Sequence, residues 1–349
     1  MKEEPLVSIC IPNYNYGKYL RNCLDSILAQ TYQNIEVLFR DNASTDNSMD
    51  IARSYEEKFM RRGINFYIFN NKRNVGSEEN SCRLMRSISG KYVYVLASDD
   101  AIEPTMVEKC VKVFEEYPSV GIVMTNRVEM DDDGKYYDVP PFYNCNCVIP
   151  GDKQAAVFMM SGVAIPGQRM VKAGVCYQTK NYKKRYQVAG DWFNNYLYIC
   201  CNDAAYITEP LCKYRVHFGN ETSESEMVLL GVMEHYKLIN DFYEMAINFR
   251  QKEAMERYDE AVKKLGQMCL RYATRYLKHD MRDVASKYIT LAPFFDVDIV
   301  HTSEYIKLKE LSEYSDDALK DYIRNHDLGT VRKTAYDPPE GSIVIEFSK

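Results

Sequence analysis

The chain has 349 residues, of which 46% are hydrophobic and 27% are charged, an ordinary composition for a globular protein. Its formal net charge of −6 argues against nucleic acid as a partner, and no apolar stretch reaches the 18 residues that would suggest a membrane span. No signal-peptide pattern follows Met1, and the eleven cysteines lack zinc-ribbon spacing. We therefore expect a cytoplasmic protein with reduced thiols.

Short apolar runs alternate with helical patterns in the first hundred residues, which predicts an α/β fold with a mostly parallel sheet and flanking helices. Strands are expected at residues 7–11, 35–39, 64–69, 92–97 and 121–125. Helices are expected at residues 19–30, 46–59 and 79–89, the second of them capped by Ser44 or Thr45. A further strand-like region covers residues 205–214.

The pattern changes to helical spacing from about Met227. A long helix is expected to Ala246, a second one at residues 252–278, shorter ones to Arg324, and a terminal strand at 343–347. The chain is thus predicted to have an α/β domain at residues 1–224 and a mainly helical C-terminal domain at 225–349.

Two adjacent carboxylates, Asp99 and Asp100, follow the apolar run at residues 92–97. Such a run is typical of a buried central strand, and ligands of open α/β sheets bind at the carboxyl ends of the strands. Carboxylate oxygens suit Mg²⁺ or Mn²⁺, which commonly bridge a carboxylate and a diphosphate. The alternative is that the pair only forms a turn or a helix N-cap.

Loops after the first two strands fall at the same edge of the predicted sheet. Tyr14 offers an aromatic face that could stack on a nucleobase, and Asp41 a carboxylate that could accept a base N–H. Alternatively, Tyr14 covers the end of the sheet and Asp41 caps a turn. Their shared position with Asp99 and Asp100 favours a binding site.

The motifs together resemble the start of a family 2 glycosyltransferase, an inverting enzyme with the GT-A fold. The resemblance covers about residues 5–220 and rests on these segments: residues 7–15, 19–20, 23–27, 30–32, 34–36 and 41–46, with Ser98-Asp99-Asp100 similar to the DXD metal motif. It implies that residues 1–224 form the catalytic domain. It also implies that Pro12, Tyr14, Asn15 and Asp41 line the nucleotide pocket. Asp99 would contact the ribose or donor, and Asp100 would hold Mn²⁺ or Mg²⁺.

One segment departs from the family pattern. Many relatives follow their Asn-x-Gly turn with a helix that ends in Ala-Arg-Asn, whereas here Asn74-Val75-Gly76 leads to residues 77–83 without that ending. Arg83 is the candidate to replace the missing donor contact, and the alternative is an exposed helix arginine.

The resemblance also points to residues beyond the sheet edge. Asp191 would be the general base, although an aspartate there could equally be a helix N-cap. Trp192 is either a platform for the acceptor sugar or part of the core. Arg215 would contact phosphate or pair with a surface acid. His217 is similar to the histidine of a Tyr-Arg-x-His loop that approaches the metal.

The sequence therefore predicts a metal-dependent inverting glycosyltransferase. The donor would be a nucleotide-diphospho-sugar, with UDP-sugar leading and dTDP- or GDP-sugar open, and the acceptor a glycan or lipid-linked glycan. The helical domain would bind acceptor, the inner face of the membrane, or a second copy of the chain. A basic loop of Lys180, Lys183, Lys184 and Arg185 fits a lipid diphosphate or is simply solvated.

Two alternatives remain at this stage. A sugar nucleotidyltransferase would need a glycine-rich loop after the first strand, which residues 12–17 do not supply. A non-catalytic nucleotide-sugar-binding subunit would not need the carboxylates at positions 99, 100 and 191.

Overall fold

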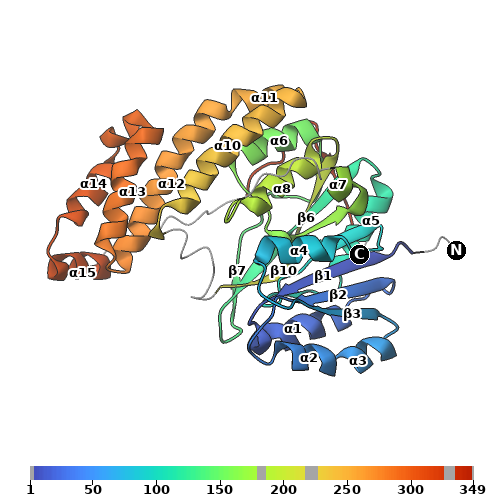
Figure 1. The fold of residues 1–349 in the computed structure, drawn as a ribbon. Helices are drawn as coiled ribbons and strands as arrows, with labels where there is room; N and C mark the ends of the chain where they lie inside the picture. Colours follow the sequence, from blue (N-terminus) through green and yellow to red (C-terminus); the bar gives the residue numbers. More distant parts are fainter. Residues whose placement is uncertain (1–3, 179–185, 217–226, 326–334, 348–349) are drawn as a thin grey trace.

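A central mixed sheet with helices on both faces forms the larger part of the molecule (Figure 1). The computed structural model describes residues 4–178, 186–216, 227–325 and 335–347. The strands are β1 (Val7–Asn13), β2 (Ile35–Asp41), β3 (Asn65–Asn70), β4 (Tyr92–Val95), β5 (Ala101–Ile102), β6 (Val120–Met130), β7 (Tyr136–Asp138), β8 (Cys147–Ile149), β9 (Arg169–Lys172), β10 (Asp203–Arg215) and β11 (Ile343–Val344). Their order is β11-β8-β10-β6-β9-β4-β1-β2-β3, with β5 against β10 and β7 against β6.

The parallel part of the sheet is β4-β1-β2-β3, as predicted. In β1, Val7 lies opposite Ile35 of β2 on one side and Tyr92 of β4 on the other. Residues 7–11 are buried on both faces, which explains why four of these five residues are apolar. Beyond β4 the sheet becomes mixed, because β9 runs antiparallel to both β4 and β6.

The helices pack into two cores, one on each face of the sheet. They are α1 (Gly17–Leu28), α2 (Ser48–Ser54), α3 (Glu56–Arg61), α4 (Ser77–Met85), α5 (Met106–Glu116), α6 (Gly151–Met160), α7 (Ala173–Gln178), α8 (Gly190–Ile199), α10 (Leu230–Asn248), α11 (Lys252–Glu256), α12 (Tyr258–Lys278), α13 (Arg282–Phe295), α14 (Ser303–Ser312) and α15 (Asp316–Asn325), with 3₁₀ turns η1 (Pro166–Gln168) and η3 (Val297–His301). One core joins a sheet face to α1, α2, α3 and α5, and the other joins the opposite face to α4, α6, α8 and the C-terminal helices.

Several predicted boundaries are wrong. The helix expected at 46–59 is two helices, α2 and α3, which meet at Tyr55. Neither Ser44 nor Thr45 caps it, because α2 begins only after Asn47. The helix expected at 79–89 begins at Ser77 and ends at Met85. A glycine with a positive φ, Gly76, precedes it and sets the earlier start.

The expected long helix at 252–278 is also interrupted, at Arg257 between α11 and α12. The terminal strand is shorter than predicted and consists of β11, which pairs antiparallel with β8. The strand expected at 121–125 is longer and runs through β6 to Met130. In each case the apolar pattern gave the type of element but not its ends.

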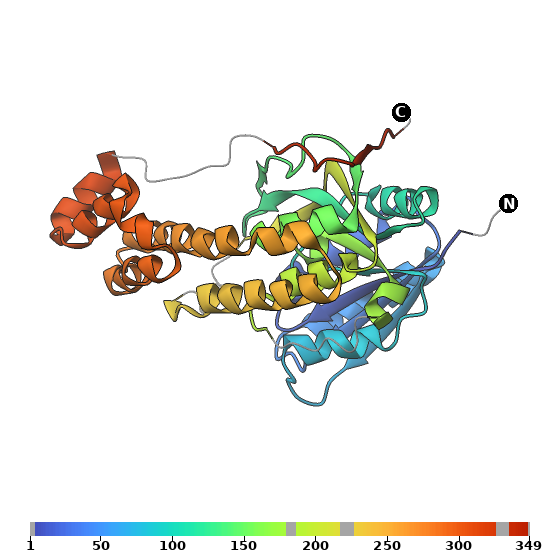
Figure 2. The same ribbon diagram turned by 90° about the horizontal axis from the view of Figure 1, so that it is seen from above.

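The C-terminal helices pack on the sheet domain at one end and project away from it at the other (Figures 1 and 2). α10 and α12 run side by side, and the rings of Tyr243 and Tyr258 lie 4.7 Å apart between them. Phe242 of α10 stacks on Tyr196 of α8 at 4.1 Å, so one apolar core continues from the sheet into these helices.

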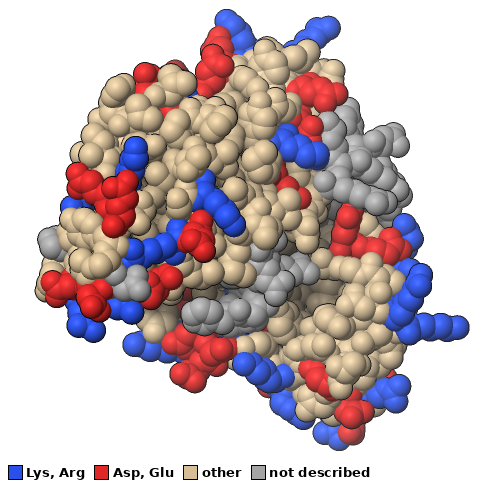
Figure 3. Space-filling model, turned by 60° about the vertical axis from the view of Figure 1, so that its left-hand side comes forward, with Lys and Arg blue, Asp and Glu red and all other residues tan. Residues whose placement is uncertain are grey.

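Among the described residues, no helix is both long enough and apolar enough to cross a bilayer. On the face drawn in Figure 3, acidic and basic side chains are interspersed rather than gathered into a field of one sign.

Candidate active site

The turn after β2 is organised by the carboxylate of Asp41. Its Oδ1 accepts hydrogen bonds from Asn13 Nδ2 at 2.8 Å and from Ser44 Oγ at 2.6 Å, and its Oδ2 accepts one from the Ser44 N–H at 2.7 Å. The side chain is fully buried. A carboxylate has about four lone-pair positions, and these three bonds occupy three of them.

The loop after β1 is tied to the same turn. Asn15 has a φ of 56°, its N–H donates to Ser44 Oγ at 2.9 Å, and its Oδ1 accepts from the Thr45 N–H at 2.8 Å. Pro12 lies opposite Arg40 in the β1–β2 register. Tyr14, in the loop after β1, is 43% exposed, so its ring is accessible to a ligand.

Asp99 and Asp100 follow β4 and are buried, with 8% and 3% of their surface exposed. Asp100 Oδ1 accepts a hydrogen bond from the Arg215 N–H at 2.8 Å. Burial, and after it the neighbouring Asp99, raise the pKa of the Asp100 carboxyl well above its usual range, while Arg215 and Arg127 oppose the shift. Two carboxylates at this depth are stabilised by a bound cation or a proton.

These residues fit a divalent metal ion. Mg²⁺ is often held by one or two carboxylates together with the phosphates of a substrate. The described residues contain no group of three or more His, Cys, Asp and Glu side chains that could hold a metal by itself. His217, the other predicted ligand, lies outside the described residues, as does the basic loop at 180–185.

Arg215 is buried, and its side chain bonds to other parts of the protein. Its Nε donates to the Asp99 carbonyl at 2.9 Å, one terminal nitrogen donates to the Asp131 carbonyl at 2.8 Å, and its guanidinium lies 4.5 Å from the ring centre of Tyr19. Its recorded partners are therefore main-chain oxygens and a ring rather than a surface acid. The side chain fastens the end of β10 to the segment that carries Asp99 and Asp100.

Asp191 lies in the first turn of α8. The expectation that it could be the N-cap is wrong, because Ala189 holds that position and the helix already begins at Gly190. An Arg169 nitrogen lies 3.7 Å from Asp191 Oδ1, and another donates to the Asp191 carbonyl at 3.2 Å. The Asp191 side chain is 52% exposed, yet the surrounding protein removes enough water to raise the pKa of its carboxyl, and Arg169 opposes this shift.

The two other predicted contacts have structural partners. Trp192 donates its indole N–H to the Phe158 carbonyl at 2.8 Å, and its ring lies 5.3 Å from that of His235, so it packs between α6 and α10. Arg83 lies 2.8 Å from Glu79 within α4 and donates to Asn71 Oδ1 at 3.2 Å.

Comparison with known proteins identifies the family. Residues 8–176 match the family described as glycosyl transferase family 2. Residues 8–176 thus belong to glycosyltransferase family 2. Glycosyltransferase GlyG of Streptococcus pneumoniae is 32% identical over 133 residues, which are 38% of this chain and 42% of GlyG. Chondroitin synthase of Escherichia coli is 37% identical over 134 residues, 38% of this chain and 19% of the synthase. The match thus spans less than half the length of these relatives.

Solved structures show the same fold. TarS 1-349 of S. aureus, in complex with UDP-GlcNAc, superposes with a TM-score of 0.54 at 14% identity, over 99% of this chain and 100% of TarS 1-349. The mannosyltransferase PcManGT of Pyrobaculum calidifontis, in complex with GDP-Man and Mn²⁺, superposes with a TM-score of 0.52 at 14% identity, over 93% of this chain and 89% of that one. The predicted GT-A fold is confirmed.

Some residues of the site escaped the sequence analysis. Asn13 orients Asp41, and its own Oδ1 is buried without a hydrogen-bond partner among the described residues, as is Ser98 Oγ. Asn13 lies inside the resembling segment, so its position was a usable signal. Arg169 and Arg127, which surround Asp191 and Asp100, lie on β9 and β6 and carry no local motif.

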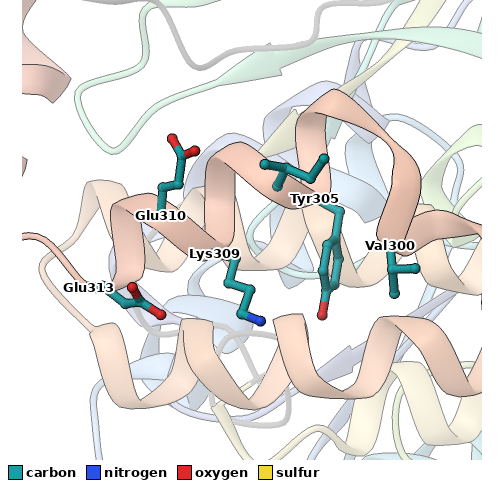
Figure 4. Close-up of a pocket in the computed structure, with 6 residues that line it drawn as sticks. Val300, Tyr305, Lys309, Glu310 and Glu313 are labelled. Atoms are coloured by element: carbon teal, nitrogen blue, oxygen red, sulfur yellow. The ribbon is translucent and has the colours of Figure 1, made fainter.

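A separate cavity of about 550 Å³ lies among the C-terminal helices. It is lined by Val300, by α14 residues Tyr305, Ile306, Lys309 and Glu310, and by Glu313 just after that helix. Figure 4 shows Tyr305 and Lys309 directed toward the neighbouring helix and Glu310 directed away from it. None of the predicted site residues lines this cavity, so it is distinct from the edge of the sheet where the carboxylates lie.

Proposed function

We propose that this chain transfers a sugar from a nucleotide-diphospho-sugar to a hydroxyl of an acceptor, with inversion at the anomeric carbon. The observation that carries the proposal is the placement of two kinds of carboxylate. Asp99 and Asp100 lie buried after β4, whereas Asp191 is half exposed on α8 beside Arg169. Leaving-group binding and proton removal need acids in such different environments.

The donor is proposed to bind at the carboxyl ends of β1, β2 and β4. Tyr14 would stack on the base and Asp41 would accept a base N–H, with Pro12 and Asn15 completing the wall. Asp99 would contact the ribose or donor. The fold shared with TarS bound to UDP-GlcNAc supports UDP-sugar as the leading donor, and PcManGT bound to GDP-Man keeps GDP-sugar open beside dTDP-sugar.

Asp100 is proposed to hold Mn²⁺ or Mg²⁺, with His217 as a further ligand and Asp99 beside it. When bound, the ion would supply positive charge against the diphosphate leaving group. Arg215 keeps the two acids in place through the Asp100 carboxylate and the Asp99 carbonyl. The PcManGT complex with Mn²⁺ supports metal dependence.

Asp191 is proposed as the general base. Its carboxylate would take the proton from the attacking acceptor hydroxyl on the face of the sugar opposite the diphosphate. Departure of the diphosphate gives an oxocarbenium-like transition state, and a single displacement inverts the anomeric carbon. The nearby Arg169 favours the ionised form that a base requires.

The acceptor is proposed to be a growing glycan or a lipid-linked glycan. The chondroitin synthase of Escherichia coli, at 37% identity, and the hyaluronan synthase of Pasteurella multocida, at 34% identity, support a glycan substrate. We place the reaction in the cytoplasm, at or near the inner face of the membrane. The cysteines whose side chains the structure describes are all free thiols, which supports a reducing compartment.

The test is a donor screen with the purified full chain. UDP-, GDP- and dTDP-sugars are incubated with and without Mn²⁺ and with chondroitin or hyaluronan oligosaccharides, and both thermal shift and sugar transfer are measured. We expect one nucleotide class to raise the melting temperature in the presence of Mn²⁺ and one donor to be consumed. Binding without consumption would favour the non-catalytic subunit, and pyrophosphate release from a nucleoside triphosphate and a sugar-1-phosphate would favour the nucleotidyltransferase.

A further inference from the structure

The turn that leads into α8 is held by a side chain from one of the C-terminal helices. Glu234 of α10 accepts three consecutive main-chain N–H groups: those of Gln187 at 2.7 Å, Val188 at 2.7 Å and Ala189 at 3.0 Å. One carboxylate oxygen takes the first of these bonds and the other takes the remaining two. Successive N–H groups that converge in this way form an anion-binding concavity.

No residue of α8 supplies this anchor itself. The N-cap of α8 is Ala189, which has no capping side chain, and Asp191 lies beyond the cap in the first turn, beside Arg169. A carboxylate at the start of a helix also complements the positive end of the helix dipole. Glu234 therefore does for α8 what a capping acid of its own would do, and the carboxylate of Asp191 remains available.

Further contacts from α10 fix both sides of Asp191. On one side, Tyr186 donates its hydroxyl to Asp241, and Lys237 lies 3.7 Å above the Tyr186 ring. Asp241 follows Glu234 by seven residues, about two helical turns, which places the two acids on the same face of α10. On the other side, Trp192 packs against His235, the residue next to Glu234.

We infer that Glu234 is a positioning residue for Asp191, so that the C-terminal helices are part of the catalytic unit of this enzyme. The inference rests on the proposed role of Asp191 as the base. Glu234 fixes residues 187–189, and these fix the first turn of α8 two residues later. Because a displacement of about 1 Å at a reacting group can cost up to 10²-fold in rate, loosening this turn should slow the chemical step.

The experiment compares Glu234→Ala and Glu234→Gln with Glu244→Ala, an exposed glutamate of the same helix. Hydrogen–deuterium exchange of residues 187–192 is measured together with kcat, the donor KM and the Kd for UDP with Mn²⁺. We expect Glu234→Ala to speed exchange at 187–189 and to lower kcat roughly 10- to 100-fold with donor affinity unchanged. Glu234→Gln, which keeps one acceptor oxygen, should recover part of kcat, and Glu244→Ala should behave as the parent.

Unchanged kcat in Glu234→Ala would overturn the inference, as would a rise of KM and Kd in step with the loss of kcat. If Glu234→Ala does not fold, Glu234→Gln alone decides by the same readouts. If the parent enzyme shows no transfer with any donor, the proposed function fails. The exchange measurement then still decides whether Glu234 holds the turn, since unchanged protection at 187–189 would contradict it.

Discussion

The main-chain N–H of Arg215 donates a 2.8 Å hydrogen bond to Oδ1 of Asp100, and the Arg215 side chain holds the carbonyl of the preceding residue, Asp99. The last residue of β10 is thus bonded to both members of the acidic pair that follows β4. Arg215 is buried and also reaches the Asp131 carbonyl, so a single side chain joins three segments of the chain. Arg215 thus holds the segment that carries the two acids in place.

Arg215→Ala should therefore weaken the fold as well as the metal site. The buried bond to the Asp99 carbonyl is lost, and the partly buried Asp131 carbonyl loses one of its two donors, so we expect the free energy of unfolding to fall by about 2–4 kcal/mol. Denaturant unfolding without ligand measures this. The control is Arg86→Ala, an exposed arginine of which 68% of the side chain is accessible, and it should change stability by less than about 0.5 kcal/mol. Equal stability of Arg215→Ala and the parent would contradict the bracing role.

Asp100→Asn separates metal binding from folding. Because burial raises the pKa of the Asp100 carboxyl, its ionised form costs stability in the metal-free protein, increasingly as the pH rises above the ordinary aspartate pKa of 3.8. Asparagine removes that charge and can still accept from the Arg215 N–H. At pH 7 we expect the variant to melt at or above the parental temperature without metal. Mn²⁺ with UDP should then stabilise the parent but not the variant, and a retained Mn²⁺-dependent shift would remove Asp100 as a ligand.

Asp41→Ala and Ser44→Ala distinguish a base-binding role from a turn-forming one. Both variants lose the bond from Ser44 Oγ to Asp41 Oδ1. Ser44→Ala keeps the main-chain N–H bond to Asp41 Oδ2, and only Asp41→Ala removes the carboxylate. If Asp41 accepts a base N–H, UDP affinity should fall by about 1–3 kcal/mol more in Asp41→Ala than in Ser44→Ala. Calorimetric titration with UDP and Mn²⁺ measures the difference. An equal loss of UDP affinity in the two variants would show that Asp41 forms the turn and does not bind the base.

The pH dependence of turnover should report Asp191. Burial raises the pKa of this carboxyl above 3.8, so the acid limb of kcat should lie at a higher pH than for an ordinary aspartate. Arg169 lowers that pKa, and Arg169→Gln should therefore move the limb further toward neutral pH. The control is Lys172→Gln, which removes the other basic residue of β9. Lys172 donates to the Pro118 carbonyl, and this variant should leave the acid limb where it is in the parent. If the acid limb does not move in Arg169→Gln, the group that titrates there is not Asp191.

Local sequence patterns were sufficient for the parallel part of the sheet and for the acids at its edge. The apolar runs of β1 and β2 are buried on both faces, and such runs can be recognised without any knowledge of their partners. Asp41 is the last residue of β2, and Asp99 follows the apolar run at 92–97. Because the strands are parallel, their position at one edge of the sheet could be predicted as well.

What could not be predicted depends on contacts between distant segments. Tyr55 and Arg257 interrupt helices in stretches whose apolar spacing continues, so nothing local marks the breaks. Arg169 stands in a four-residue antiparallel strand without a motif, and only the fold brings it to Asp191. Likewise, Glu234 reads as an ordinary polar position of an amphipathic helix, although its partners are main-chain groups about 45 residues earlier in the chain.

The most direct test of the central claim is the rate of sugar transfer by Asp191→Asn. Because Ala189 rather than Asp191 is the N-cap of α8, the substitution should leave the helix and the binding of UDP with Mn²⁺ intact. We expect turnover to fall roughly 10²–10⁴-fold, the usual contribution of general-base catalysis, and the parent to form a product of inverted anomeric configuration. A fully active Asp191→Asn enzyme, or a product of retained configuration, would contradict the account.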